Sequence, residues 1–75
     1  MMALDVELFG QLADGSLRRQ SLTLETPLPV SEVVALLGVN PEEVGLITID
    51  GVQSSMEDEV PLTCRLCFFP PMSGG

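Results

Sequence analysis

Histidine and lysine are both absent from this 75-residue chain. The first absence argues against acid–base catalysis and metal binding by this chain, and the second leaves arginine as its only cationic side chain. Histidine is the usual acid–base group near neutral pH and the commonest nitrogen ligand for metals. Three arginines oppose eleven acidic residues, which gives a net charge of −8. Because phosphate binding needs a basic face, we expect no nucleic acid among the partners. The acidic balance is compatible both with docking onto basic partners and with a purely solubilising role.

Long apolar runs are also missing from the sequence. No run approaches the length of a membrane span, and the first five residues lack the basic and apolar regions of a signal peptide. We therefore expect a cytoplasmic protein with no membrane partner.

The composition nevertheless predicts a packed core. The apolar fraction is 45% and the mean hydropathy is +0.38, which argues against disorder. A domain of this size buries only about 60–65% of the surface that its unfolded chain exposes, so we expect modest stability. We expect one folded domain over residues 1–69 and a flexible tail over residues 70–75.

The two cysteines form a C-x-x-C pattern from Cys64 to Cys67. This pattern occurs in redox pairs and as half of a zinc site. Zinc needs two further ligands, and the chain has no second pair, so we expect no metal site. Residues three apart in a strand face opposite sides, which disfavours a disulfide between them. We interpret both cysteines as strand residues whose further role the sequence leaves open.

Alternation of apolar and polar residues predicts strands over residues 4–9, 21–25, 46–51 and 64–69, the third of which runs into a turn, with a further short strand from Val52. The first two strands are expected to form a hairpin around an Asp-Gly turn. The pair Arg18-Arg19 precedes the second strand, either as its solvated start or as a partner contact. In the last strand, we expect Phe68 to face the core and Phe69 the open face.

Residues 30–37 change to a helical period, and Gly38 is placed to end the helix. Asn40 and Glu43 predict a short capped turn after it. One helix on one face of a sheet is an α+β layout. The helical crossover allows the first and last strands to pair in parallel at the centre of a mixed sheet of four to five strands. This arrangement is the β-grasp, although the pattern alone does not require it.

The C-terminal segment carries the most specific signal. Phe69 is followed by Pro70-Pro71, which cannot continue a strand, and then by Met72, Ser73, Gly74 and Gly75. Fully extended, residues 70–75 reach about 20 Å at roughly 3.3–3.6 Å each. Glycine lets a partner close in on the backbone, and the α-carboxylate of Gly75 is unshielded by side chains. The pattern slightly favours a carboxylate delivered into another protein's active site over a frayed terminus.

Nearly the whole chain resembles the MoaD/ThiS-type ubiquitin-like sulfur carriers. The resemblance is carried by the helix segment, by Pro41-Glu42-Glu43-Val44-Gly45 with Ile47-Thr48-Ile49-Asp50-Gly51, and by the ending Phe68-Phe69-Pro70-Pro71-Met72-Ser73-Gly74-Gly75. The small subunit of molybdopterin synthase is the most similar member. The chain departs from the family at Thr63 to Leu66, where Gly-Asp and an apolar pair are usual, and at Asp50, where Asn is more usual.

The resemblance implies that Gly75 is the reactive residue. A ubiquitin-activating-like enzyme would adenylate its carboxylate with ATP-Mg, and a sulfur donor would convert the adenylate to a thiocarboxylate. The large subunit of molybdopterin synthase would then receive the tail, and the sulfur would go to a pterin precursor. The chain is then a cosubstrate that binds no cofactor and is not itself an enzyme. The expected partner contacts are Phe69, Pro70, Pro71, Met72, Ser73 and Gly74.

Two alternatives use the same tail. The sulfur acceptor could be the thiazole of thiamine or another sulfur metabolite, or the chain could be a protein modifier joined to lysine. The Phe-Phe-Pro-Pro ending favours the molybdopterin carrier. The sequence does not distinguish molybdenum from tungsten, and it identifies neither the activating enzyme nor the sulfur donor.

Overall fold

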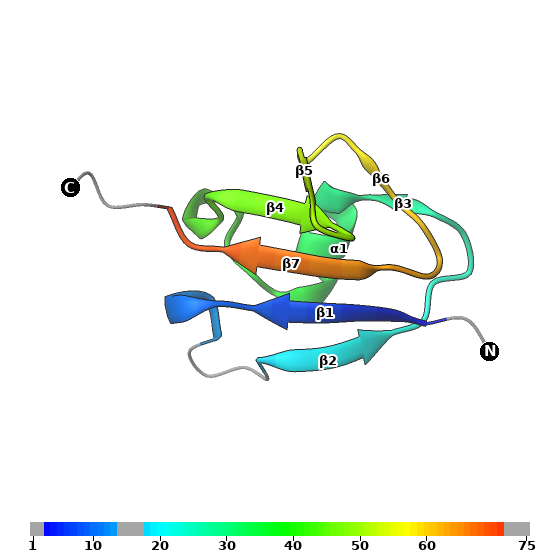
Figure 1. The fold of residues 1–75 in the computed structure, drawn as a ribbon, viewed down its shortest axis with the longest axis horizontal. Helices are drawn as coiled ribbons and strands as arrows, with labels where there is room; N and C mark the ends of the chain where they lie inside the picture. Colours follow the sequence, from blue (N-terminus) through cyan, green and yellow to red (C-terminus); the bar gives the residue numbers. More distant parts are fainter. Residues whose placement is uncertain (1–2, 14–17, 72–75) are drawn as a thin grey trace.

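The computed structural model describes residues 3–13 and 18–71, and its centre is a five-stranded mixed sheet with the order β2-β1-β7-β4-β5 (Figure 1). The strands of this sheet are β1 (Leu4–Leu8), β2 (Arg19–Leu22), β4 (Leu46–Ile49), β5 (Val52–Ser54) and β7 (Arg65–Phe69). The remaining elements are helix α1 (Val30–Leu37), 3-10 turns at Gly10–Ala13 and Pro41–Glu43, and the two-residue strands β3 (Leu28–Pro29) and β6 (Glu59–Val60). The architecture is the α+β layout that the sequence predicts.

The two central strands, β1 and β7, come from opposite ends of the chain and pair in parallel. Val6 lies opposite Leu66, and Leu8 lies opposite Phe68. β2 and β4 flank this pair in antiparallel orientation. Because both ends of the sequence meet at the sheet centre, the expected β-grasp arrangement is confirmed.

Alternate residues of the central strands face the helix and form the core with it. The fully buried side chains are Leu4, Val6, Leu8, Val30, Val33, Val34, Val60, Leu66 and Phe68. The expected helical stripe is confirmed in α1, whose three valines are buried. Phe68 is the largest of these side chains and is completely buried, so it is central to the packing.

Both ends of α1 are held by backbone groups. Gly38 ends the helix in the left-handed conformation with φ of 74°, as the sequence predicts. At the start, Pro29 supplies no side-chain cap. Instead, the N–H groups of Val30 and Ser31 donate to the carbonyl oxygens of Asp58 and Met56 at 2.8 and 3.0 Å. The loop between β5 and β6 therefore caps the helix from outside.

The second strand differs from its predicted position. It spans Arg19–Leu22 rather than residues 21–25. Its pairing with β1 stops at Leu22, because Leu22 lies opposite Leu4, the first residue of β1. Leu24 is still buried, although it lies beyond the strand. Arg19 is the exposed first residue of the strand, which agrees with the solvated start. The β3–β6 pair was not predicted, because two-residue strands carry no readable alternation.

Asp50 and Gly51 connect β4 to β5 with φ angles of 51° and 84°. Positive φ at both central residues is the geometry of a tight hairpin turn that suits the sheet's twist. The Asp50 N–H donates to the Arg65 carbonyl at 2.8 Å, and Asp50 Oδ1 accepts from the Arg65 N–H at 2.9 Å. The turn therefore anchors the start of β7, next to the segment in which the sequence departs from the sulfur carriers.

The described residues contain no helix that is both long and apolar enough to cross a membrane.

The packing predicts unequal effects for two neighbouring phenylalanines. Phe68→Ala should lower the free energy of unfolding by about 3–5 kcal/mol, because it removes the largest buried side chain. Phe69→Ala is the matched control, since Phe69 is adjacent in sequence but only partly buried on the other face. Urea unfolding followed by circular dichroism measures both losses. Equal losses would contradict the assignment of the two faces.

Candidate docking face and tail exit

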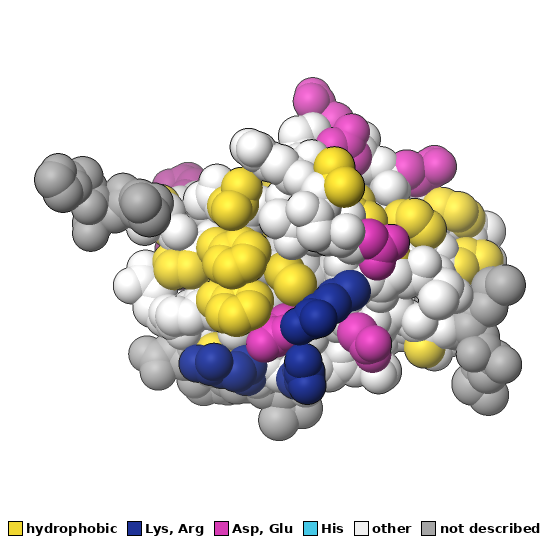
Figure 2. Space-filling view, viewed as in Figure 1, with side chains coloured by type: hydrophobic (Ala, Val, Ile, Leu, Met, Phe, Trp, Pro, Cys, Tyr) yellow, Lys and Arg dark blue, Asp and Glu magenta, His cyan; other side chains and the backbone are white. Residues whose placement is uncertain are grey.

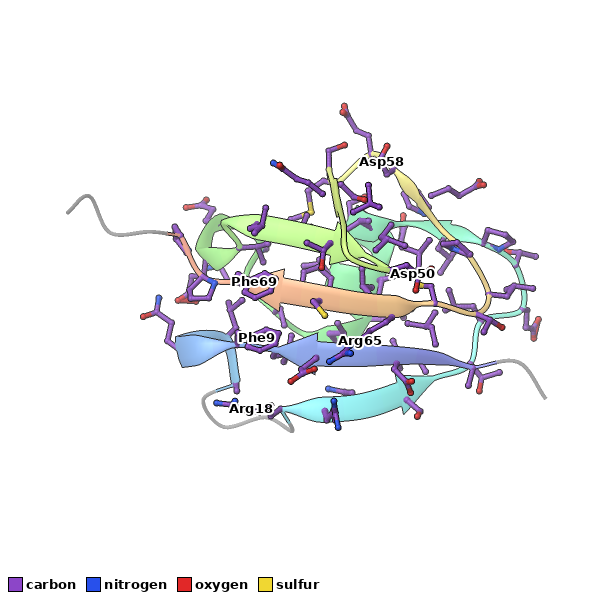
Figure 3. All side chains as sticks on the ribbon, viewed as in Figure 1. Phe9, Arg18, Asp50, Asp58, Arg65 and Phe69 are labelled. Carbon is purple, nitrogen blue, oxygen red and sulfur yellow. The ribbon has the colours of Figure 1, made fainter. Side chains whose placement is uncertain are left out.

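The face of the sheet opposite α1 carries an aromatic pair beside the C-terminal end of β7. The Phe9 N–H donates to the Phe68 carbonyl at 3.0 Å, which continues the parallel ladder and sets Phe9 beside Phe69. The two rings stack with centroids 4.5 Å apart and an interplanar angle of 8° (Figure 3). Neither ring belongs to the buried core.

Two more apolar side chains extend this pair. Leu46 lies opposite Phe69 on β4, and Cys67 lies two residues before Phe69 on the same face of β7. Leu46 is 37% exposed. We call Phe9, Leu46, Cys67 and Phe69 the apolar cluster. In the space-filling view, apolar side chains form a continuous patch at this end of the open face (Figure 2).

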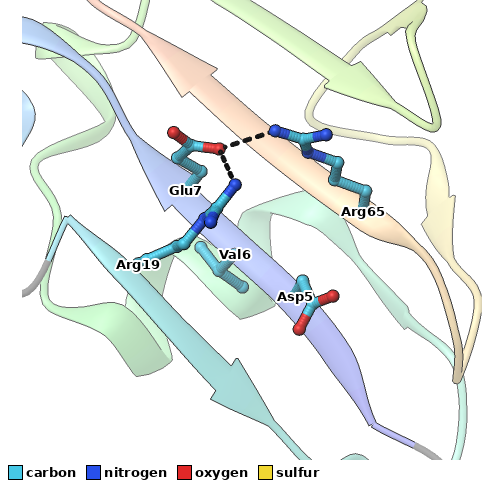
Figure 4. Close-up of a pocket in the computed structure, with 5 residues that line it drawn as sticks. All are labelled: Asp5, Val6, Glu7, Arg19 and Arg65. Atoms are coloured by element: carbon cyan, nitrogen blue, oxygen red, sulfur yellow. Dashed lines mark hydrogen bonds and ion pairs between the residues drawn. The ribbon is translucent and has the colours of Figure 1, made fainter.

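All three arginines of the chain lie next to the apolar cluster on the same face (Figures 2 and 3). Arg65 Nη2 donates to Glu7 Oε1 at 2.9 Å, and Arg19 Nη2 lies 3.5 Å from the same oxygen (Figure 4). The three residues occupy neighbouring strands, because Glu7 pairs with Arg19 and with Cys67. They line a shallow pocket of about 230 Å³ together with Asp5 and Val6.

The two arginines shift the protonation equilibrium of Glu7. The hydrogen bond from Arg65, with the charge of Arg19 beside it, holds the pKa of Glu7 below its usual value. The same hydrogen bond raises the pKa of Arg65. Glu7 therefore carries its charge in the folded protein and orients both guanidinium groups along the face.

The cysteines do not form a disulfide. Both thiols are free; Cys64 belongs to the core, and Cys67 belongs to the apolar cluster on the opposite face. Burial raises the pKa of the Cys64 thiol, so the thiol loses its proton less readily than an exposed cysteine does. Within residues 3–13 and 18–71, no group of three potential metal ligands gathers in one place.

The tail leaves the sheet between two glycines. The Gly45 N–H donates to the Phe69 carbonyl at 2.8 Å, which extends the pairing of β7 by one step. A methyl group built on Gly45 would lie 2.4 Å from Pro71 Cα, and one built on Gly10 would lie 2.9 Å from Pro70 Cγ. Both prolines therefore pass close against the body of the domain at its tail end.

Part of the predicted site falls within the described structure. Phe69 lies at the open face as expected, and Pro70 and Pro71 follow it directly. Met72, Ser73, Gly74 and Gly75 lie outside the described residues. Sequence reasoning did not identify the partners of Phe69 within the chain, which are Phe9 and Leu46. The outward position of Phe9 at the end of an alternating strand is the signal that indicates one of them.

The pairing of Glu7 predicts a pH dependence of stability. Since the folded-state pKa of Glu7 lies below the ordinary value of 4.5, its ion pairs stabilise the protein above that pH. This contribution is lost as the pH falls through the lower, folded-state pKa. Glu7→Gln should therefore flatten the decrease in melting temperature between about pH 5 and about pH 3.

The matched control is Glu57→Gln, because Glu57 is exposed and makes no ion pair with any other described residue. Thermal unfolding in buffers of equal ionic strength measures all three proteins. A wild-type pH profile that Glu7→Gln leaves unchanged would contradict the stabilising role of the pair.

Comparison with known proteins identifies similar solved structures, whereas no protein-family model and no curated protein matches the chain. SAMP1 from Haloferax volcanii has a TM-score of 0.71 and 24% identity, over 97% of this chain and 99% of that one. A Pyrococcus furiosus protein assigned as molybdopterin converting factor subunit 1 has a TM-score of 0.71 and 15% identity, over 96% of this chain and 100% of that one.

A further structure of small archaeal modifier protein 1 from H. volcanii has a TM-score of 0.70 and 16% identity, over 96% of this chain and 100% of that one. Each alignment covers nearly the full length of this chain and of the other chain, so the similarity extends over the whole domain. At these identities the likeness establishes the fold, and the chain adopts the ubiquitin-like β-grasp fold of these proteins.

Proposed function

We propose that this chain is a ubiquitin-like sulfur carrier that supplies sulfur for the synthesis of molybdopterin. The observation that carries the proposal is the position of the apolar cluster at the base of the tail. Phe69 belongs to the cluster and is six residues from Gly75. A partner that covers the cluster is therefore within about 20 Å of chain from the terminal carboxylate, at roughly 3.3–3.6 Å per residue.

In this proposal Gly75 carries the chemistry and partner proteins catalyse it. A carboxylate is a poor electrophile, so an adenylating enzyme first joins it to the α-phosphate of ATP, with Mg²⁺ bound to the nucleotide and pyrophosphate as the leaving group. A sulfur donor then displaces AMP and leaves a C-terminal thiocarboxylate. Sulfur is a better nucleophile than the oxygen it replaces, and the large synthase subunit uses it to build the dithiolene of the pterin.

The open face supplies the docking surface for these partners. The apolar cluster offers an aromatic anchor of the kind that dominates binding energy at interfaces. The adjacent arginines bring the chain's positive charge to this face, where Asp5 and Glu7 lie among them (Figure 2). Within the proposal, Pro70, Pro71, Met72, Ser73 and Gly74 form the spacer that enters the partner's active site.

A second candidate is a protein modifier joined to lysine side chains. The similarity to the small archaeal modifier protein 1 supports this candidate. The modifier needs the same adenylate of Gly75, but an amine rather than sulfur would then attack it. The two candidates therefore share the activation step and differ in its product.

Reconstitution with an adenylating enzyme, ATP-Mg and a sulfur donor tests the proposed carrier. The intact mass of the chain should rise by the replacement of one oxygen atom with sulfur. Deleting Gly75 should abolish this gain, whereas Leu36→Ala should retain it, because Leu36 is exposed on α1 and lies outside the docking face. Adducts with lysines of other proteins in place of a sulfur gain would favour the modifier.

The docking face predicts a loss of affinity when its anchor is removed. Phe69→Ala should weaken binding to the large synthase subunit by more than about 1 kcal/mol, or about fivefold in Kd. Leu36→Ala is the matched control, because it removes an exposed apolar side chain from α1. Isothermal titration measures both. If the two variants bind equally well, the apolar cluster is not the docking surface.

A further inference from the structure

We propose that Gly45 is a positioning residue whose missing side chain sets the direction in which the tail leaves the domain. The inference rests on the proposed function, in which the tail must deliver Gly75 to a partner's active site. It assigns part of that delivery to a residue outside the tail. Gly45 directly precedes β4 and lies beside the end of β7.

The backbone of Gly45 does not itself require glycine. Gly10, Gly38 and Gly51 have positive φ angles, where other residues are strained, but Gly45 is not among the positive-φ glycines of the described structure. Gly45 is also exposed, so the core does not exclude a side chain there. The need for glycine at this position must therefore come from a neighbour.

That neighbour is the first part of the tail. A Cβ on Gly45 would lie 2.4 Å from Pro71 Cα, 2.7 Å from Pro71 N and 2.9 Å from the Pro70 carbonyl carbon. All three are backbone atoms, so no side-chain rotation can relieve the overlap. Any L side chain at position 45 would therefore push the tail backbone aside, whereas glycine lets it lie against the domain.

Pro70 and Pro71 transmit a change in the position of the tail's first residues to the residues that follow. Each proline ring fixes φ near −65°, so a shift at Pro71 changes the direction of the following chain rather than being absorbed by a local rotation. The hydrogen bond from the Gly45 N–H to the Phe69 carbonyl, at 2.8 Å, holds the tail's origin at the same place. Gly10 bounds the other side, where an added Cβ would lie 2.9 Å from Pro70 Cγ.

A displaced tail should impair the reaction more than the docking. The apolar cluster does not include Gly45, so the partner still binds the domain. The reacting carboxylate, however, approaches ATP in the wrong geometry, and a misplacement of about 1 Å can cost about 100-fold in rate. Gly45→Ala should therefore lower kcat with little change in KM.

The experiment measures ATP–pyrophosphate exchange by the adenylating enzyme as a function of the concentration of the full-length chain. Gly45→Ala is expected to lower kcat at least about tenfold and to change KM less than about threefold. Gly51→Ala is the matched control: Gly51 has a φ of 84°, but a Cβ there meets nothing within 4 Å. It introduces strain without touching the tail and should keep the wild-type kcat.

A second measurement tests the positioning without the enzyme. Cα–Hα residual dipolar couplings of residues 70–75 should change in Gly45→Ala and remain at the wild-type values in Gly51→Ala. Unchanged couplings in Gly45→Ala would overturn the inference, and so would an unchanged kcat for this variant in a system that activates the wild type. If the wild type is not activated at all, the proposed function fails, and the couplings still decide the role of Gly45.

Discussion

The parallel pairing of β1 with β7 is the constraint on which the rest of the structure depends. It places Leu66 and Phe68 against α1 and, by the alternation of strand side chains, turns Cys67 and Phe69 to the opposite face. A shift of one residue in this register would expose the core side chains and bury Phe69 instead. The packing that stabilises the domain therefore also determines what the open face presents.

The same pairing determines where the tail begins. β7 ends at Phe69, between the loop that contains Gly10 and the residues that precede β4. The apolar cluster, the three arginines and the origin of the tail consequently lie on one face, although they come from both ends and the middle of the sequence. A partner that binds this face is therefore close to the point at which the tail begins.

The sequence predicted the features that depend on local patterns. The apolar periods of β1, α1 and β7 were readable because each buries one side against a common core, and Gly38 marked the helix end by its need for a positive φ. The limits of β2 were not readable, because they depend on where β1 stops pairing. The stacking of Phe9 on Phe69 depends on the parallel register of β1 with β7, and the approach of Pro71 to Gly45 depends on the antiparallel pairing of β7 with β4. Local alternation encodes neither pairing.

The central claim, that this chain carries sulfur on Gly75, is tested most directly by the intact mass of the chain isolated from its own host. The account predicts a fraction in which one oxygen atom is replaced by sulfur, and this fraction should disappear when the pterin precursor and the large synthase subunit are added. Recovery of the chain solely as adducts with lysines of other proteins, without any sulfur-bearing form, would contradict the account.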